Sequence, residues 1–417
     1  MNRFFITVLA TACLSTHLFA SKSVEQEFPL LEIVVIPADQ IPGSSIIVRD
    51  DSPLIAQATS AQAASTPLPE ELPPVIIPDV SVMAAAPKVA SASPLVDAQP
   101  KATTLKLLYD TLTIEEISKR KLTELIIKDT TDHEADLISQ LPNTQELRIH
   151  NSKITVKGLQ KITSNLSQLK SIGLGCNSSK EKDILVASPE VIDQLKHLQH
   201  LTKLSLWCAG ITAKSFNGLK HLEKLQEIDL GFNDLNSDDM RILAQNFPQS
   251  LEKLQLIQNK IGTLGFINLF SNNNLSLSEL KLYNNKIDDR NIEDMHNHPL
   301  PKTLTELDLG SNDIGPKFMR ALSHIIPDGL KILNLENSRN IGDEGIVAFM
   351  ARPLPASLET LKLYRCGITE VGIETLANKL PLSVKTLELD PDISIKAKEV
   401  LQGKGFKDEN YGNWKKI

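Results

Sequence analysis

The chain of 417 residues is mildly acidic, with 51 Asp and Glu residues against 44 Lys and Arg and a formal net charge of −7. Binding to nucleic acid is therefore disfavoured, because contacts with phosphates need a clustered basic surface and no long run of one charge occurs. Aromatic residues make up only 4% of the chain while leucine is abundant, which favours a core of aliphatic layers. The 4 cysteines are too sparse for a disulfide framework.

The N-terminus has the layout of a secretory signal peptide. Arg3 precedes an apolar stretch over residues 4–14, and small residues follow near the expected cleavage point. We predict a signal peptide over residues 1–20 and hence a secreted, periplasmic or cell-surface protein. Cys13 raises the alternative of a lipid anchor, but Ala10 stands where a lipoprotein signal has a large aliphatic residue. No later segment is apolar and long enough to predict an integral membrane segment.

Between residues 21 and 104 the composition shifts to proline, alanine, serine and valine. Proline at this density is incompatible with helix interiors and central strands, and little periodic apolar pattern is present to bury. We predict a disordered linker over residues 21–104, partly in the polyproline II conformation. Two short β-prone pieces, 30–36 and 44–50, leave open an extra strand added to a sheet edge.

Ordered structure is predicted to begin near Leu105. The stretch 105–121 has apolar positions at helical spacing, and Thr113 with Glu116 has the sequence of a capping box. We therefore expect a helical N-terminal cap over residues 105–121. At the other end, residues 394–417 are expected to form a polar cap and tail.

A twelve-residue pattern recurs between these caps, over residues 122–393. "LTELDLGSNDIG" (Leu304–Gly315) returns as "LEKLQLIQNKIG" (Leu251–Gly262), and successive copies are mostly about 26 residues apart. The alternating leucines predict a short strand with one buried face. The asparagine that follows stands at a sharp turn, where its side chain can bond to the backbone of neighbouring turns. We expect a ladder of buried amides from Asn177, Asn233, Asn259, Asn285 and Asn312.

After each turn the apolar period changes from two to about 3.6 residues. In "IGPKFMRALSHII", Phe318, Leu322 and Ile325 share one helical face, and Pro316 suits the first helical position. Each repeat is therefore predicted to be one strand plus one helix that cannot bury its core alone. Stacked units predict an α/β solenoid in the form of a horseshoe, with parallel strands on the concave face and helices on the convex face.

The L-x-x-L-x-L-x-x-N-x-I pattern and the repeat length resemble the ribonuclease-inhibitor-like class of leucine-rich repeat proteins, over roughly residues 122–393. The resemblance implies the horseshoe fold and a scaffold that binds other proteins. Some copies depart from the pattern, since Ala209 and Cys366 replace the asparagine and the repeat from Leu330 has an altered turn. A protruding loop is expected after Cys176, where the repeat is longer.

We find no candidate catalytic residue, metal site or cofactor site. His197 and His221 occupy equivalent repeat positions, so duplication explains them, and no cysteine or carboxylate completes a metal-binding set. Cys176 and Cys208 share a register, which leaves a disulfide open, although the loop expected after Cys176 disturbs that register.

Acidic pairs follow several of the turns, namely Asp238–Asp239, Asp288–Asp289 and Asp343–Glu344. Paired carboxylates are one requirement of general acid–base catalysis, but these pairs repeat along the chain instead of converging on one site. We expect them in the first turn of each helix, where negative charge interacts favourably with the helix dipole.

Side chains that flank the buried strand positions point to the concave surface. One column there contains Trp207, Tyr283 and Tyr364, which are one of the 2 tryptophans and two of the 4 tyrosines of the chain. Exposed aromatic residues are typical anchors of interfaces, although tyrosine also has a good strand propensity. We predict a protein-binding face that comprises Trp207, Ile257, Lys281, Tyr283, Asp308, Lys362, Tyr364 and Arg365.

The sequence thus predicts an exported, monomeric and non-enzymatic scaffold that binds a partner protein through its concave face. The resemblance leaves open a second function, the regulation of an enzyme as an inhibitor or GTPase activator with the same fold. An added catalytic domain such as a ubiquitin ligase is disfavoured, because the stretch after Ile393 is short and contains no cysteine.

Overall fold

The structure is a computed structural model that describes residues 104–106, 111–128, 130–150, 153–175, 189–216, 218–271 and 275–417. The predicted signal peptide and nearly all of the predicted linker lie outside these residues. The strands are β1 (Thr104–Lys106), β2 (Thr111–Thr113), β3 (Glu124–Lys128), β4 (Glu146–His150), β5 (Ser171–Gly175), β6 (Lys203–Ser205), β7 (Glu227–Asp229), β8 (Lys253–Gln255), β9 (Glu279–Lys281), β10 (Glu306–Asp308), β11 (Ile332–Asn334), β12 (Thr360–Lys362), β13 (Thr386–Glu388), β14 (Phe406–Asn410) and β15 (Asn413–Lys416).

The α-helices are α2 (Ile114–Arg120), α3 (Asp132–Ile138), α4 (Val156–Asn165), α5 (Pro189–Leu195), α6 (Ser237–Asn246), α7 (Gly262–Leu269), α8 (Pro316–Ile325), α9 (Gly342–Phe349), α10 (Glu370–Lys379) and α11 (Ile395–Gly403). Three short 3₁₀ helices accompany them in the described residues, η2 (Ala213–Phe216), η3 (Leu219–His221) and η4 (Met295–Asn297). In the part of the chain that the structure describes, no helix has the length and apolar character needed to cross a bilayer.

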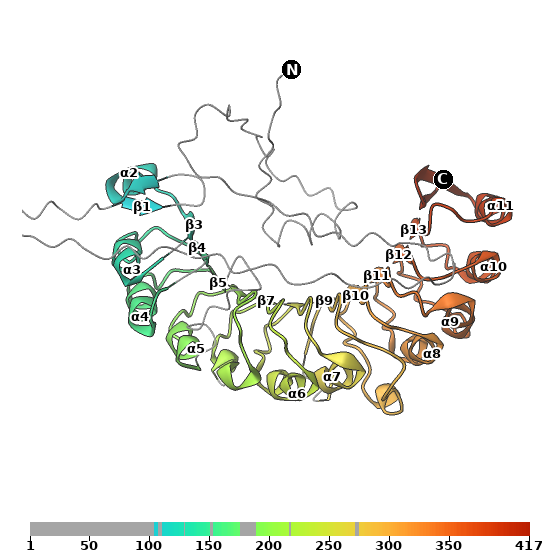
Figure 1. The fold of residues 1–417 in the computed structure, drawn as a ribbon, viewed down its shortest axis with the longest axis horizontal. Coiled ribbons are helices and arrows are strands. Elements are labelled where there is room, and N and C mark those ends of the chain that lie inside the picture. Colours follow the sequence, from blue (N-terminus) through green and yellow to red (C-terminus); the bar gives the residue numbers. More distant parts are fainter. Residues whose placement is uncertain are drawn as a thin grey trace, which may run out of the picture. The chain divides into compact units, whose positions relative to one another are not determined.

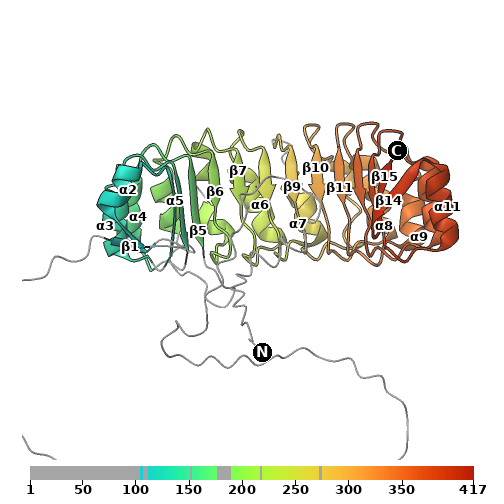
Figure 2. The same cartoon turned by 90° about the horizontal axis from the view of Figure 1, so that it is seen from above.

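One sheet of thirteen strands runs through the described residues, from β3 in chain order to β13 and then to β15 and β14. From β3 to β13 all neighbours are parallel and in register, so that Leu307 on β10 lies between Leu280 on β9 and Leu333 on β11. The strands line the inner side of an arc and the helices its outer side (Figure 1), and Figure 2 shows the strands side by side in chain order. The predicted α/β solenoid is confirmed.

The core is a stack of aliphatic layers, as the composition predicts. In the repeat of β10 the side chains of Leu304, Leu307 and Leu309 are all fully buried between sheet and helices. The equivalent leucines of neighbouring repeats lie directly above and below them, and the same core continues from Leu112 to Trp414. Because each repeat shares its core only with its neighbours, the fold depends on stacking and on closed ends.

Buried asparagines cross-link successive turns. The Asn312 amide donates to the carbonyls of Leu282 at 3.0 Å and Leu309 at 2.8 Å, while its Oδ1 accepts from the backbone N–H groups of Asn285 and Ile287. Asn233 and Asn259 bond in the same way to their own and the preceding repeat. Asn285 donates to the carbonyls of Leu256 and Tyr283, but its Oδ1 accepts no hydrogen bond from the described residues. Asn177 lies outside them.

The turn before each ladder position has a left-handed backbone. The residue there has φ between +52° and +61° in seven repeats, although it is never glycine: Cys208, Phe232, Gln258, Asn284, Ser311, Asn337 and Arg365. A left-handed residue with a Cβ costs roughly 1–2 kcal/mol. The buried bonds of the ladder oppose this cost and hold the turn. Where Cys366 replaces the asparagine, its thiol takes over part of the role and donates to the Leu335 carbonyl at 3.1 Å.

The helical layer departs from the prediction of one helix per repeat. The repeat of β6 has only the 3₁₀ helices η2 and η3, and the repeat of β9 has only η4. Gly218 lies between η2 and η3 in the first of these segments, and Pro299 and Pro301 follow η4 in the second. Glycine and proline both disfavour a continuous α-helix, so the chain makes tighter turns there.

The N-terminal cap is only partly helical, contrary to our expectation for residues 105–121. Helix α2 has the predicted capping box, because Thr113 Oγ1 accepts from the Glu116 N–H while the Glu116 carboxylate accepts from the Thr113 N–H. Ahead of it, β1 and β2 pair antiparallel as Leu105 with Leu112. The threonines at both strands favour extended structure over a helix, which explains the difference.

The C-terminal residues 394–417, for which we expected a polar cap and tail, form a folded cap up to Lys416 without a separate tail. After α11, the strands β14 and β15 make an antiparallel hairpin, and β15 adds to β13 by pairing Trp414 with Leu387. The Trp414 side chain is only 1% exposed. The hairpin covers the end of the leucine stack, because an uncovered last repeat would leave its apolar side in water.

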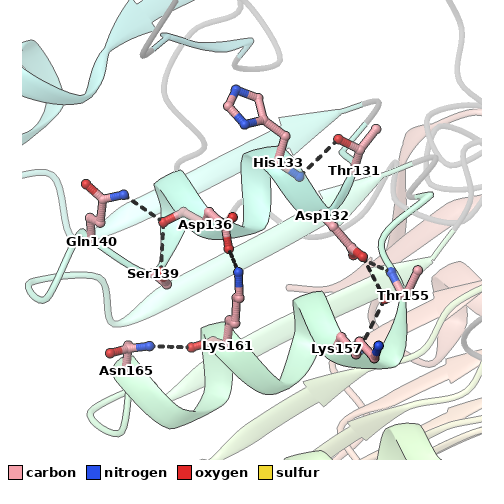
Figure 3. A network of polar contacts seen from close by, with 10 residues as sticks. All are labelled: Thr131, Asp132, His133, Asp136, Ser139, Gln140, Thr155, Lys157, Lys161 and Asn165. Atoms are coloured by element: carbon pink, nitrogen blue, oxygen red, sulfur yellow. Dashed lines mark hydrogen bonds and ion pairs between the residues drawn. The ribbon is translucent and has the colours of Figure 1, made fainter. Parts of the chain in front are cut away.

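Acidic side chains fasten the helix starts of adjacent repeats. Asp132 on α3 accepts from the backbone N–H and the hydroxyl of Thr155, the N-cap of α4, both at 2.7 Å (Figure 3). Asp343 on α9 bonds in the same way to Thr369, the N-cap of α10. The predicted placement in the first turn of a helix is confirmed for Asp238–Asp239 in α6 and Asp343–Glu344 in α9. It is wrong for Asp288–Asp289, because the described residues between that turn and β10 contain no α-helix. Asp343 in addition caps the next helix.

Candidate protein-binding face

The predicted binding residues lie in two neighbouring columns of the concave sheet face. Lys281, Asp308 and Lys362 occupy the last position of β9, β10 and β12, and the parallel register aligns these positions across the sheet. The aromatic column follows two residues later in each repeat. Trp207, Tyr283 and Tyr364 stand three strands apart there, which is roughly 14 Å at the usual strand spacing. The structure therefore presents three separate anchors and no continuous aromatic patch.

Trp207 leans over the next repeat. Its ring centroid lies 4.5 Å from that of Phe232, and a Cβ placed on Gly231 would lie 3.0 Å from its Cδ1 atom. The absence of a side chain at Gly231 therefore leaves the room that the Trp207 indole occupies. Its N–H donates to the Asp229 carboxylate at 3.0 Å. Ile257, also half-buried, follows in the column one strand further on.

Tyr283 repeats this arrangement three strands later. A Cβ on Gly310 would lie 2.9 Å from the Tyr283 Cδ2 atom and 3.1 Å from the Glu336 Cγ atom. The Gly310 N–H donates to the Asp308 carboxylate at 2.9 Å. Tyrosine and glutamate thus converge over a residue without a side chain, beside a second carboxylate.

Tyr364 has a different neighbour. The Arg365 guanidinium lies 4.9 Å from the centre of its ring, a distance at which cation and ring attract each other. The Arg365 side chain is exposed, and its backbone N–H donates to Asp390 at 2.8 Å. Arg365 and Tyr364 therefore form one unit at the edge of the face.

The lysines of the face pair with carboxylates of their own strand or of an adjacent strand. Lys281 Nζ lies 2.6 Å from Glu279 and 3.7 Å from Glu306, and Lys362 Nζ lies 3.2 Å from Glu388. Burial opposes the charge of Lys281, but these glutamates outweigh it and raise the lysine pKa. Both predicted contact lysines are thus fixed in position and are not loose surface charges.

Two carboxylates of the face have strongly raised pKa values. Burial raises the pKa of Asp308 to about 6. Burial and the negative charge of Asp308 raise the pKa of Glu336 to about 7. Asp229 beside Gly231 is shifted in the same direction, chiefly by burial. Like charges at close range resist ionisation together, so this part of the sheet is electrostatically strained at neutral pH.

The sequence places Glu336, Gly310 and Gly231 in the same column as the aromatic residues, but we did not select them as binding residues. The sequence contains a signal for this arrangement, the tripeptide Asp-Leu-Gly, which occurs at 229–231 and again at 308–310. In both places an aromatic residue of the preceding strand fills the glycine space. That partner lies 24 or 27 residues earlier, so the relation becomes visible only with the register known.

The remaining candidates take no part in this face. His197 and His221 are exposed, and the described residues contain no cluster of three or more potential metal ligands. Cys208 is buried, whereas its suggested disulfide partner Cys176 lies outside the described residues. Burial raises the pKa of the Cys366 thiol to about 12, which excludes it as a thiolate nucleophile at neutral pH.

Stacked strand–turn–helix units with a buried amide ladder and an open concave sheet define the fold of this chain as a leucine-rich repeat solenoid. The family model described as leucine rich repeat matches residues 301–323 and 330–350. No curated protein matches the sequence.

Two solved structures are similar in fold. The yeast Rad7 and Elc1 complex matches with 18% identity and a TM-score of 0.45, over 70% of this chain and 78% of the other. An internalin (inlF) of Listeria monocytogenes matches with 18% identity and a TM-score of 0.36, over 68% of this chain and 90% of the other.

Proposed function

We propose that this protein is an exported scaffold that recognises a partner protein through its concave face. The observation that carries the proposal is the column of Trp207, Tyr283 and Tyr364, three half-buried aromatic residues on an otherwise polar sheet. Rigid aromatic side chains provide a large contact area at a low cost in conformational entropy, and such residues dominate binding energy in protein interfaces.

The surroundings of these anchors support binding over a role in stability alone. Glycine at 231 and 310 leaves room for the rings, and ion pairs fix the lysines beside them. A face whose side chains are already ordered loses less entropy when a partner docks. The same properties would serve a regulator of an enzyme, with the enzyme as the bound protein.

Affinity capture from the source cells tests the proposal. The full chain is compared with the triple variant Trp207→Ala, Tyr283→Asp, Tyr364→Asp, after circular dichroism has shown that both fold. We expect the wild type to retain a protein that the variant loses. A second triple variant at exposed convex residues, Leu264→Asp, Val347→Asp and Val371→Asp, is the matched control. Loss in the control with retention in the first variant would place binding on the helices.

Export is a separate part of the proposal, and it is supported by the signal-peptide layout of residues 1–20. We expect the mature protein to begin near Ser21 and to accumulate outside the cytoplasm. N-terminal sequencing of the protein from fractionated cells measures both. A cytoplasmic protein that retains Met1 or Asn2 at its N-terminus would contradict this part and leave the binding proposal intact.

A further inference from the structure

The concave face is unbalanced in charge where it carries the two tyrosines. On β9 to β13 and the residue two positions after β11, five carboxylates face two ammonium groups, Lys281 and Lys362. The carboxylates are Glu279, Glu306, Asp308, Glu336 and Glu388. We name Lys281, Tyr283, Asp308, Glu336, Lys362 and Tyr364 the β9–β12 face.

In the part of the chain that the structure describes, three of the five carboxylates form ion pairs with Lys281 or Lys362, and two do not. Lys281 lies within 3.7 Å of Glu279 and Glu306, and Lys362 lies 3.2 Å from Glu388. Neither Asp308 nor Glu336 forms an ion pair within 4.0 Å among the described residues. The charge of Lys362 acts on both carboxylates, and that of Lys281 on Asp308, without offsetting the effect of burial, and the Asn334 side chain is a polar neighbour that both share. The β9–β12 face therefore has an unmet demand for positive charge.

Burial makes this demand costly for the free protein. The Glu336 side chain is only 9% exposed, and it extends over Gly310 toward the Tyr283 ring. Burial together with the charge of Asp308 raises the pKa of Glu336 to about 7. A single cation placed between the two carboxylates would interact with both and offset part of their charge, which is favourable because a buried charge without a counter-ion is costly.

The chemistry beside these carboxylates selects the kind of cation. Tyr283 and Tyr364 flank Glu336 on either side. Gly310 has no side chain, so the space above its backbone is open to the Tyr283 ring and the Glu336 side chain. A carboxylate next to an aromatic ring is the environment in which a planar guanidinium both forms charge-assisted hydrogen bonds and stacks. The neighbouring Arg365 already rests on the Tyr364 ring in this manner within the chain.

We propose that the β9–β12 face receives an arginine side chain of the partner protein, which pairs with Glu336 and Asp308 and stacks on Tyr283. This inference rests on the proposed function and specifies the partner: the bound segment is basic and presents at least one arginine. Binding then releases protons near neutral pH, because the incoming cation lowers the pKa of the carboxylates.

Fluorescence anisotropy with defined peptides tests the site on the full chain. The probe is a labelled ten-residue glycine–serine peptide with three arginines, and its counterpart contains the neutral isostere citrulline at the same positions. We expect the arginine peptide alone to bind. The double variant Asp308→Asn, Glu336→Gln should weaken it about ten-fold, as expected for the loss of a close charge pair.

A matched control variant separates this site from general attraction to an acidic protein. Glu124→Gln with Glu146→Gln removes two carboxylates from the same sheet face at β3 and β4, far along the array. We expect it to leave the affinity within a factor of two of wild type. Equal weakening in both double variants, equal binding of the citrulline peptide, or no binding at all would overturn the inference.

The dependence on pH provides a second readout. The groups that face Glu336 are Asp308 on β10, Asn334 on β11, Lys362 on β12 and Glu388 on β13, so acid titrates the carboxylates and not the lysine. Wild-type affinity should fall several-fold from pH 8 to pH 5.5, and Glu336→Gln should reduce that slope while Asp308 maintains the remainder. An unchanged slope in Glu336→Gln would contradict the assignment.

The two proposals fail in different ways. If the aromatic triple variant loses a captured partner but the double carboxylate variant retains it, the concave face binds and the arginine inference is wrong. If the arginine peptide binds to Glu336 and Asp308 but the aromatic triple variant still captures the partner protein, the arginine site exists and the proposed mode of partner binding is wrong.

Discussion

At the residue scale, the ladder asparagines differ in the number of backbone groups that they satisfy. Asn312 donates to three carbonyls and accepts from two N–H groups, all in the interior. Asn285 donates to two carbonyls, and its Oδ1 atom has no partner in the described residues. In the repeat from Leu251, the Gly262 N–H at the start of α7 donates to the backbone carbonyl of Asn285 at 2.9 Å and not to its Oδ1 atom.

We therefore expect unequal costs for two chemically identical substitutions. Asn312→Ala removes five hydrogen bonds to buried backbone groups and should lower the free energy of unfolding by about 2–3 kcal/mol. Of these five groups, only the Gly310 carbonyl keeps another partner among the described residues, the Asn284 N–H. Asn285→Ala should cost about 1 kcal/mol, because fewer bonds are lost. Urea denaturation followed by circular dichroism measures both variants. Equal costs would show that the observed difference in hydrogen bonding has no energetic weight.

Glu336 makes the stability of the free protein depend on pH. Its pKa is about 7 in the folded chain against an ordinary value of 4.5, so the folded state binds the proton more tightly than the unfolded state. The free energy of unfolding should then decrease as the pH rises from about 5 to about 7.5, and Asp308 with a pKa of about 6 adds to this trend.

Glu336→Gln removes this effect. At pH 8 the variant should be more stable than wild type by on the order of 1 kcal/mol, and at pH 5 the two should be nearly equal. The urea midpoints at the two pH values measure the difference, with Glu146→Gln as the control. A variant that is less stable than wild type at pH 8 would show that Glu336 is satisfied in the free protein.

At the element scale, the helix starts depend on carboxylates of neighbouring repeats. Asp289 lies in a repeat that has only a 3₁₀ helix, yet its oxygens accept from the N–H groups of Gly315, Lys317 and Phe318 at 2.9–3.1 Å. Gly315 is the N-cap of α8 and has no side chain to do this itself. A residue from the preceding repeat therefore supplies the cap.

Asp289→Ala should destabilise α8 locally, by about 1–2 kcal/mol as for the loss of an N-cap. Amide hydrogen exchange at residues 315–318 should become faster, while exchange in α10 should not change. Asp238→Ala is the control, because Asp238 is an exposed residue in the first turn of α6. Protection at 315–318 that survives Asp289→Ala would refute the capping role.

The strands were the predictable elements, and the segments between them were not. Leucines such as Leu307 and Leu309 determine both the face and the register of a strand, so the sheet follows from the pattern alone. The convex segments depend on local breakers such as Gly218 and Pro299, whose effect competes with the apolar period. In the binding face, single positions such as Tyr283 could be predicted, but the contact of Tyr283 with Gly310 and Glu336 requires three strands in register.

At the scale of the whole molecule, the array is one continuous core that must be closed at both ends. The C-terminal closure depends on Trp414, which is almost fully buried against the last repeat although its indole N–H has no partner in the described residues. The side chain thus contributes through packing and not through hydrogen bonding. Its position on β15 also joins the hairpin to β13.

Trp414→Ala should cost about 3–5 kcal/mol, the usual range for removal of a large buried aromatic side chain. Trp414→Phe retains most of the packing and removes the unpaired N–H, so it should cost much less. Thermal unfolding by calorimetry compares the two variants with wild type. Near-wild-type stability of Trp414→Ala would mean that the hairpin is dispensable for closing the array.

Site-specific photo-crosslinking in the source cells tests most directly that a partner protein binds to the concave face. A benzophenone side chain replaces Ile257, which lies between Trp207 and Tyr283 in the concave column, or Val347, which is 49% exposed on the convex helix α9. The proposed function predicts a discrete adduct of higher mass from position 257 that is absent from position 347. Adducts from position 347 alone would contradict a concave binding face.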